Sequence, residues 1–81
     1  MNTLLSSIPS GETVIVETVK NAALKPKLME MGFIHGKALT VLFRAPFGDP
    51  IAVDIQGYIL SLRLDEAALI EVREYVPSQS I

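Results

Sequence analysis

The chain contains no cysteine and no tryptophan, and it has a single histidine among its 81 residues. Without cysteine, disulfide bonds, thiolate metal sites and cysteine nucleophiles are all excluded. The sequence also lacks a serine in the context of a nucleophile elbow and a glycine-rich phosphate loop. We therefore predict that the protein is not an enzyme.

Clusters of positive charge and long apolar runs are absent as well. The formal net charge is -2 and the basic residues are scattered, which disfavours nucleic-acid binding and adsorption to anionic lipid. No apolar run approaches the ~20 residues of a membrane helix. Residues 1–5 lack the basic start of a signal peptide. These features predict no direct membrane insertion, and the lack of cysteine suits a reducing cytosol.

Apolar residues are abundant in what remains, at 49% of the sequence. The length predicts a single domain over residues 1–81. Because a chain of this size buries only about 60% of its unfolded surface, its core is thin and some apolar side chains stay exposed. A protein partner is one use for such side chains.

Residues of high β-propensity recur in short segments bounded by glycine and proline. In residues 37–44 the alternation places Leu39, Val41 and Phe43 on one face. Gln56 and Gly57 form a predicted tight hairpin turn. The predicted strands cover residues 13–19, 37–44, 51–56, 58–62 and 70–73, and residues 76–81 are predicted to form a frayed tail.

Between the first two predicted strands, residues 21–32 carry a helical pattern. Leu24, Leu28 and Met31 recur on one helix face, which we expect to cover the core. Met29 lies off this stripe, and we predict that it is exposed and available for adaptable binding.

The ends of this helix and of a second helical turn carry capping signals. Asn21 is a candidate N-cap, or the regular helix begins later, near Pro26. Gly32 suits the left-handed position after the helix, and Phe33 can then pack back on Leu28. Residues 65–68 are predicted to form one helical or 3₁₀ turn with Asp65 as its cap.

The order of these elements predicts the architecture. Short strands in so few residues cannot build a sandwich, whereas a strongly bent barrel buries one face of every strand. We predict a mainly β fold, a small SH3-like β-barrel of about five strands with one short α-helix after the first strand.

Residues 45–50, Ala-Pro-Phe-Gly-Asp-Pro, separate two predicted strands. Because proline fixes φ and glycine permits positive φ, we expect a stiff, shaped loop that holds Phe47 outward. Phe47 is either an anchor that faces a partner or a cap that folds back over the barrel mouth. The Asp49 carboxylate either accepts backbone N–H bonds in an Asx-type turn or is offered to a partner or a divalent cation.

Potential metal ligands are few. Fe(II) sites commonly require two histidines and a carboxylate, and His35 is the only histidine. Asp49 and Asp54 are the other candidates, but nothing in the spacing places them beside His35. We predict no metal site and no cofactor, with Fe(II) or another divalent transition metal as the alternative.

Residues 28–36 (LMEMGFIHG) resemble the helix-to-glycine signature of FeoA domains, and residues 45–51 (APFGDPI) resemble that family's A-P-L-G-D-P-I loop. Residues 60–63, followed by residues 66–67 and 70–72, are similar to its C-terminal pattern. His35 departs from the family, which usually has proline there. The resemblance implies an SH3-like barrel and a small cytoplasmic accessory protein of bacterial ferrous iron uptake. It also implies a partner, the cytoplasmic region of the FeoB transporter.

We therefore predict that the protein acts by protein–protein interaction, docking to the cytoplasmic region of an FeoB-like transporter. Residues 46–49 of the loop are the predicted partner-binding surface, with Met29 and Phe33 at the helix end. The predicted site residues are Pro46, Phe47, Gly48, Asp49, Met29 and Phe33, and no catalytic or metal-binding residue is predicted. The alternative is a metal-responsive SH3-like module that acts with a transcriptional repressor; the oligomeric state is left open.

Overall fold

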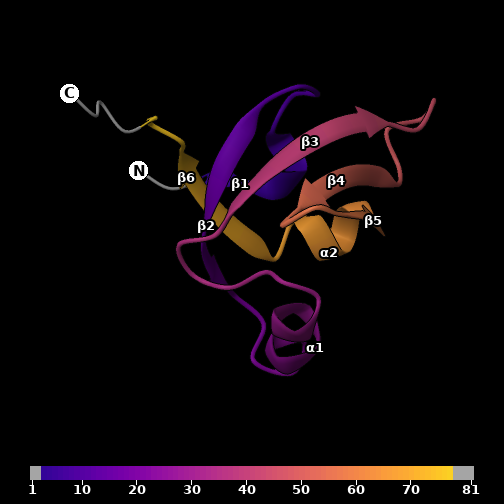
Figure 1. The fold of residues 1–81 in the computed structure, drawn as a ribbon. Helices are drawn as coiled ribbons and strands as arrows, with labels where there is room; N and C mark the ends of the chain where they lie inside the picture. Colours follow the sequence, from indigo (N-terminus) through magenta and orange to yellow (C-terminus); the bar gives the residue numbers. More distant parts are fainter. Residues whose placement is uncertain (1–2, 78–81) are drawn as a thin grey trace.

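The computed structural model describes residues 3–77, which form a mainly β structure with two short α-helices and one 3₁₀ turn (Figure 1). In chain order the elements are β1 (Thr3–Leu4), η1 (Leu5–Ser7), β2 (Thr13–Val19), α1 (Lys25–Glu30), β3 (Ala38–Arg44), β4 (Ile51–Ile55), β5 (Tyr58–Leu62), α2 (Leu64–Ala67) and β6 (Ile70–Glu74).

All strands belong to one antiparallel sheet with the order β1-β6-β2-β3-β4-β5. The sheet is not closed within residues 3–77, because β1 and β5 remain its two edges. Figure 1 shows β6 running across β2 behind β3, with α2 close to β4 and α1 at one end of the molecule.

The core is entirely apolar among the described residues. Buried residues alternate with less buried ones along most of β2 and the first part of β3, as expected for strands with one buried face. The fully buried large side chains are Leu5, Val16, Leu28, Phe33, Leu39, Val41, Ile51, Val53, Ile55, Leu62, Ile70 and Val72.

Two features of the topology differ from the sequence prediction. The sheet has six strands, because Thr3 and Leu4 pair with Val72 and Glu71 of β6. A strand of two residues is too short to carry an alternating pattern, so sequence reasoning missed it. The helix α1 consequently follows the second strand, not the first.

The Gln56–Gly57 hairpin is confirmed. Both residues have positive φ, 55° and 86°, and Ile55 pairs directly with Tyr58. Two central residues with positive φ match the turn type that joins twisted strands most tightly. The Asp54 Oδ1 accepts the Gly57 N–H at 3.2 Å and completes the turn.

The prediction that Phe43 lies on the same strand face as Leu39 and Val41 is wrong. The register between β3 and β4 shifts between Val41 and Phe43, so Leu42 is an extra residue in β3. A bulge of this kind reverses the facing of every residue beyond it. Phe43 is therefore 59% exposed.

Helix α1 begins at Lys25 with Pro26 in its first turn, which confirms the later of the two predicted starts. The Asn21 side chain instead closes the preceding turn, accepting the N–H groups of Ala23 and Leu24 at 2.8 and 3.2 Å.

The predicted end of α1 is confirmed. Gly32 has φ of 110°, and its N–H donates to Met29 O at 3.0 Å. The Phe33 N–H donates to Leu28 O at 3.0 Å. These two bonds form a Schellman motif, which directs the Phe33 side chain back into the core.

The predicted Asp65 cap of α2 is wrong. The N-cap residue is Arg63, and its N–H donates to Glu66 Oε1 at 3.0 Å. The backbone therefore enters α2 two residues earlier than the sequence indicated. The predicted frayed tail covers residues 76–81, and residues 78–81 lie outside the described residues. Residues 75–77 are described and form neither helix nor strand.

Candidate functional site

Residues 45–50 connect β3 to β4 and form the proline loop. The Ala45 N–H donates to the Pro50 carbonyl at 3.0 Å, and the Gly48 N–H donates to the Ala45 carbonyl at 2.7 Å. Gly48 has φ of 85°, a conformation that glycine adopts without a steric cost. The loop thus has an internally bonded backbone, as the stiff-loop prediction requires.

Two side chains fix the base of the proline loop to other elements. Asp49 Oδ1 accepts the N–H of Leu64, the first residue of α2, at 3.0 Å. The Asx-type turn predicted for Asp49 is therefore replaced by a bond to a segment fifteen residues away in sequence. On the other side, Arg44 Nη2 donates to the carbonyls of Ser6 and Ile8 at 2.8 and 2.6 Å.

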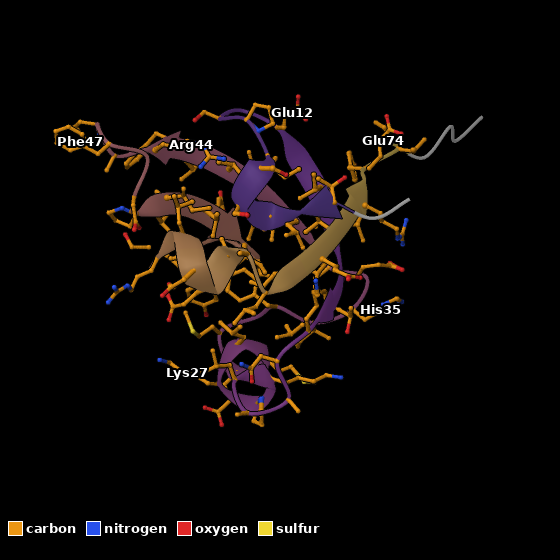
Figure 2. All side chains as sticks on the ribbon, turned by 180° about the vertical axis from the view of Figure 1, so that it is seen from behind. Glu12, Lys27, His35, Arg44, Phe47 and Glu74 are labelled. Atoms are coloured by element: carbon orange, nitrogen blue, oxygen red, sulfur yellow. The ribbon has the colours of Figure 1, made fainter. Side chains whose placement is uncertain are left out.

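Phe47 stands at the tip of this anchored loop and is 98% exposed. Figure 2 shows its ring extending away from the body of the molecule, beyond the ends of β3 and β4. The alternative in which Phe47 folds back over the barrel mouth is therefore wrong. Its neighbours Pro46 and Asp49 are also exposed, and Gly48 is partly buried.

The helix end predicted to join this surface lies elsewhere. Figure 2 places Lys27 of α1 and Phe47 in opposite parts of the molecule, so Met29 on α1 is not brought to the proline loop. Met29 is exposed as predicted, at 41%. Phe33 is 1% exposed and belongs to the core, so its predicted role as a partner contact is wrong.

The candidate metal ligands are held on separate elements. His35 Nδ1 lies 2.8 Å from the carbonyl oxygen of Glu17, while Asp54 and Asp49 bond to Gly57 and Leu64. Within residues 3–77, no three His, Cys, Asp or Glu side chains gather where they could hold a metal ion.

Sequence reasoning also missed exposed apolar residues on and beside β5. Tyr58 and Ile59 are 70% and 68% exposed, and Phe43 lies on β3 two strands away. The exposure of β5 follows from its position at the sheet edge, and that of Phe43 follows from the β3 bulge. Neither the strand order nor the bulge leaves a local signal in the sequence.

The chemistry available at the proline loop is recognition. The loop presents an aromatic ring, two prolines and a carboxylate already bonded to the backbone of α2, but no nucleophile paired with a base. No helix in the described part of the chain is long and apolar enough to cross a membrane. Fold and site together define a small β domain with an exposed aromatic loop.

The family follows from comparison with known proteins. The family model described as the FeoA domain matches residues 3–74, so the chain belongs to the FeoA family. A curated relative from Porphyromonas gingivalis, an Fe(2+) transport protein A/Fe(2+) transporter FeoB fusion protein, is 42% identical over 69 residues. The match covers 84% of this chain and 8% of the fusion protein, so the chain spans a small part of that relative.

Solved structures confirm the fold class. The structure of an FeoA-like protein from Clostridium acetobutylicum aligns with a TM-score of 0.85 and 31% identity, covering 99% of this chain and 94% of that one. Stenotrophomonas maltophilia FeoA in complex with zinc, described as a prokaryotic SH3 domain protein, aligns with a TM-score of 0.77 and 28% identity. That alignment covers 86% of this chain and 88% of the other. The fold is therefore SH3-like, as predicted, with an open sheet.

Proposed function

We propose that the protein is a cytoplasmic accessory of ferrous iron uptake that binds the cytoplasmic region of an FeoB-like transporter through its proline loop. The observation that carries this proposal is the Phe47 ring, 98% exposed on a loop whose base is bonded to α2 and to the N-terminal segment. The FeoA family membership and the fusion of FeoA to FeoB in one relative support the choice of partner.

The proline loop fits an interface anchor because its conformation is already set. Binding normally costs free energy to order flexible loops and side chains, and a preorganised loop avoids much of that cost. Bonds from Asp49 and Arg44 hold the loop before any partner arrives. A phenylalanine buried at the centre of an interface is worth about 2 kcal/mol or more when truncated.

Docking affects transport by favouring one transporter conformation over another. A partner shifts such an equilibrium only by the difference between its affinities for the two conformations. Fusion of the two domains, as in the Porphyromonas gingivalis relative, would raise their effective concentration and strengthen a weak contact. Such an interaction requires no bound cofactor and no nucleic acid, and iron is the cargo of the partner.

The test is a binding titration of the protein with the isolated cytoplasmic GTPase region of an FeoB transporter. We expect micromolar binding and a loss of about 30-fold for Phe47→Ala, the equivalent of 2 kcal/mol. Phe43→Ala is the matched control, because Phe43 is also an exposed phenylalanine but lies on the strand and not in the loop. Absence of binding at ~100 μM, or equal losses for the two variants, contradicts the proposal.

The repressor-associated module considered from sequence shares this fold, and the fusion to FeoB in a relative favours the transport accessory. The two functions differ in what they bind. A supershift of a repressor–DNA complex on addition of the protein would support the regulatory function instead.

A further inference from the structure

The edge strand β5 lacks the usual protection against pairing with another strand. Natural sheet edges are blunted by short length, charged side chains, proline or a bulge. Among the described residues the opposite edge, β1, has two residues, whereas β5 has five. Its sequence, Tyr-Ile-Leu-Ser-Leu, contains neither charge nor proline, and its register with β4 is unbroken.

The register identifies the backbone groups that are free along this edge. In a two-residue hairpin the closing pair, here Ile55 and Tyr58, is hydrogen-bonded, and bonded pairs then alternate along the ladder. The N–H and C=O groups of Tyr58, Leu60 and Leu62 therefore face β4, and those of Ile59 and Ser61 face away from it. Within residues 3–77 no other strand pairs with β5 on that side.

The free edge has defined ends. At one end the Gly57 N–H is taken by Asp54, and at the other the Arg63 N–H is taken by Glu66. The groups left for a partner are those of Ile59 and Ser61, which together offer two donors and two acceptors. An added strand of about five residues would satisfy them.

A pocket of about 360 Å³ lies beside this edge, between the C-terminal end of α1 and the inner face of the β4–β5 hairpin. Its walls include Met31, Ile55 and Leu60. Gly32 brings the end of α1 close to the sheet, since a Cβ there would lie 3.6 Å from the Ile55 side chain. A strand added to β5 points alternate side chains to the same face as Leu60, and these would enter the pocket.

The charges around the pocket indicate which kind of strand would bind there. Glu30 is exposed and is the only charged residue among those that line the pocket. On the other face of the hairpin, Asp54 pairs with Ile59. Both acids favour a basic strand. A second copy pairing through its own β5 would bring an uncharged strand, which does not match them.

We propose that the free edge of β5 and the pocket beside it bind an extended segment of another protein by strand addition. An apolar side chain of that segment fills the pocket, and a lysine or arginine lies opposite Glu30. This recognition mode takes its affinity from main-chain hydrogen bonds and its specificity from alternate side chains. The surface is separate from the proline loop, because the pocket lies at the Gln56 end of β4 and the proline loop at the Ile51 end.

The test uses two blocked synthetic peptides, TKTLTLT and its reverse TLTLTKT, in which leucine and lysine share one strand face. Titration into the ¹⁵N-labelled full chain is followed by amide chemical shifts. We expect at least one peptide to shift the Ile59 and Ser61 amides, with Kd on the order of 10⁻⁴ M. In an added strand, alternate N–H groups face β5. A peptide N-methylated at its threonines and one N-methylated at its leucines and lysine should therefore differ in affinity: one pattern should weaken binding about tenfold, and the other should leave binding unchanged.

Two variants of the protein sharpen the test. Ser61→Pro removes an N–H that faces away from β4, so the hydrogen bonds between β4 and β5 are kept. An added strand would lose one hydrogen-bond donor and would clash with the proline ring. We expect about tenfold weaker peptide binding, with Ser61→Val as the matched control. The unmodified protein should bind the lysine peptide about threefold more tightly than the same peptide with glutamate in place of lysine. In Glu30→Lys the glutamate peptide should bind about threefold more tightly instead.

Three results would overturn the proposal. The first is no shift of the Ile59 or Ser61 amides at ~2 mM peptide, where a Kd of 10⁻⁴ M gives near saturation. The second is equal binding of both N-methylated patterns. The third is a dimer in sedimentation experiments that Ser61→Pro dissociates, which would assign the edge to a second copy. Phe47→Ala should leave peptide binding unchanged, so this test is independent of the transporter contact.

Discussion

Phe33 and Phe47 each lie next to a glycine of positive φ in a backbone turn, and the two turns place their rings in opposite environments. Phe33 comes directly after Gly32 at the end of α1 and is 1% exposed. Phe47 comes directly before Gly48 in the proline loop and is 98% exposed. Both glycines have positive φ, so a neighbouring glycine in this conformation does not by itself distinguish a buried phenylalanine from an exposed one.

The difference arises from what each turn is bonded to. At the helix end, the bond from Phe33 N–H to Leu28 O turns the chain back over the apolar face of α1. In the proline loop, Asp49 and Arg44 fix the base of the loop, and the tip projects past the ends of β3 and β4. One turn thus serves the core, and the other holds an apolar ring in water, where only a partner can cover it.

The largest predicted effect belongs to Phe33→Ala. The substitution empties a fully buried site, so we expect the free energy of unfolding to fall by about 3–5 kcal/mol. A native domain has only about 5–15 kcal/mol in total, so the variant should be marginally folded. Urea denaturation followed by circular dichroism measures the change.

Phe33→Leu is the control for this prediction, because it keeps most of the apolar volume and should cost clearly less than the alanine variant. A loss below ~1 kcal/mol for Phe33→Ala would mean that the Phe33 side chain is not part of the core.

The second prediction compares the two glycines directly. Alanine at Gly32 must adopt φ of 110° within a bonded Schellman motif, and we expect a loss of about 1–2 kcal/mol. Alanine at Gly48 meets the same type of strain at φ of 85°, but its Cβ would point into open space, whereas a Cβ at Gly32 would contact Ile55. We expect a smaller loss for Gly48→Ala, and chemical denaturation of the two variants in parallel would detect a reversed order.

The sequence was sufficient for features that depend on local chemistry. The strand pattern of residues 13–19, the Gln56–Gly57 turn and the glycine that ends α1 all follow from propensity and positive φ. The resemblance to FeoA domains was also readable, because it rests on contiguous residues, and the family match over residues 3–74 confirms it.

The sequence was insufficient wherever a long-range contact decides the outcome. Asp49 bonds to Leu64 of α2, and no spacing rule connects a loop to a helix fifteen residues later. The bulge that exposes Phe43 depends on the register with β4, and the separation of Met29 from Phe47 depends on the whole fold. The sequence could identify the proline loop as a candidate surface, but it could not show which residues from other elements lie beside that loop.

The third prediction concerns the bond that ties the proline loop to α2. Asp49→Ala removes the acceptor for the Leu64 N–H, and we expect a loss of about 0.5–1.5 kcal/mol in the free energy of unfolding. Asp49→Asn keeps an acceptor oxygen and should lose less. Hydrogen exchange of the Leu64 amide should be faster in Asp49→Ala, and an unchanged exchange rate would show that this bond does not hold the loop.

The smallest effect on stability is expected for Phe47→Ala, the counterpart of the first prediction. The ring has almost no contact with the rest of the molecule, so its removal should change the free energy of unfolding by less than ~0.5 kcal/mol. The same urea titration that unfolds Phe33→Ala measures this value. A loss above ~1 kcal/mol would mean that Phe47 packs against the protein in solution, and the contrast between an anchor held in water and a residue held in the core would then fail.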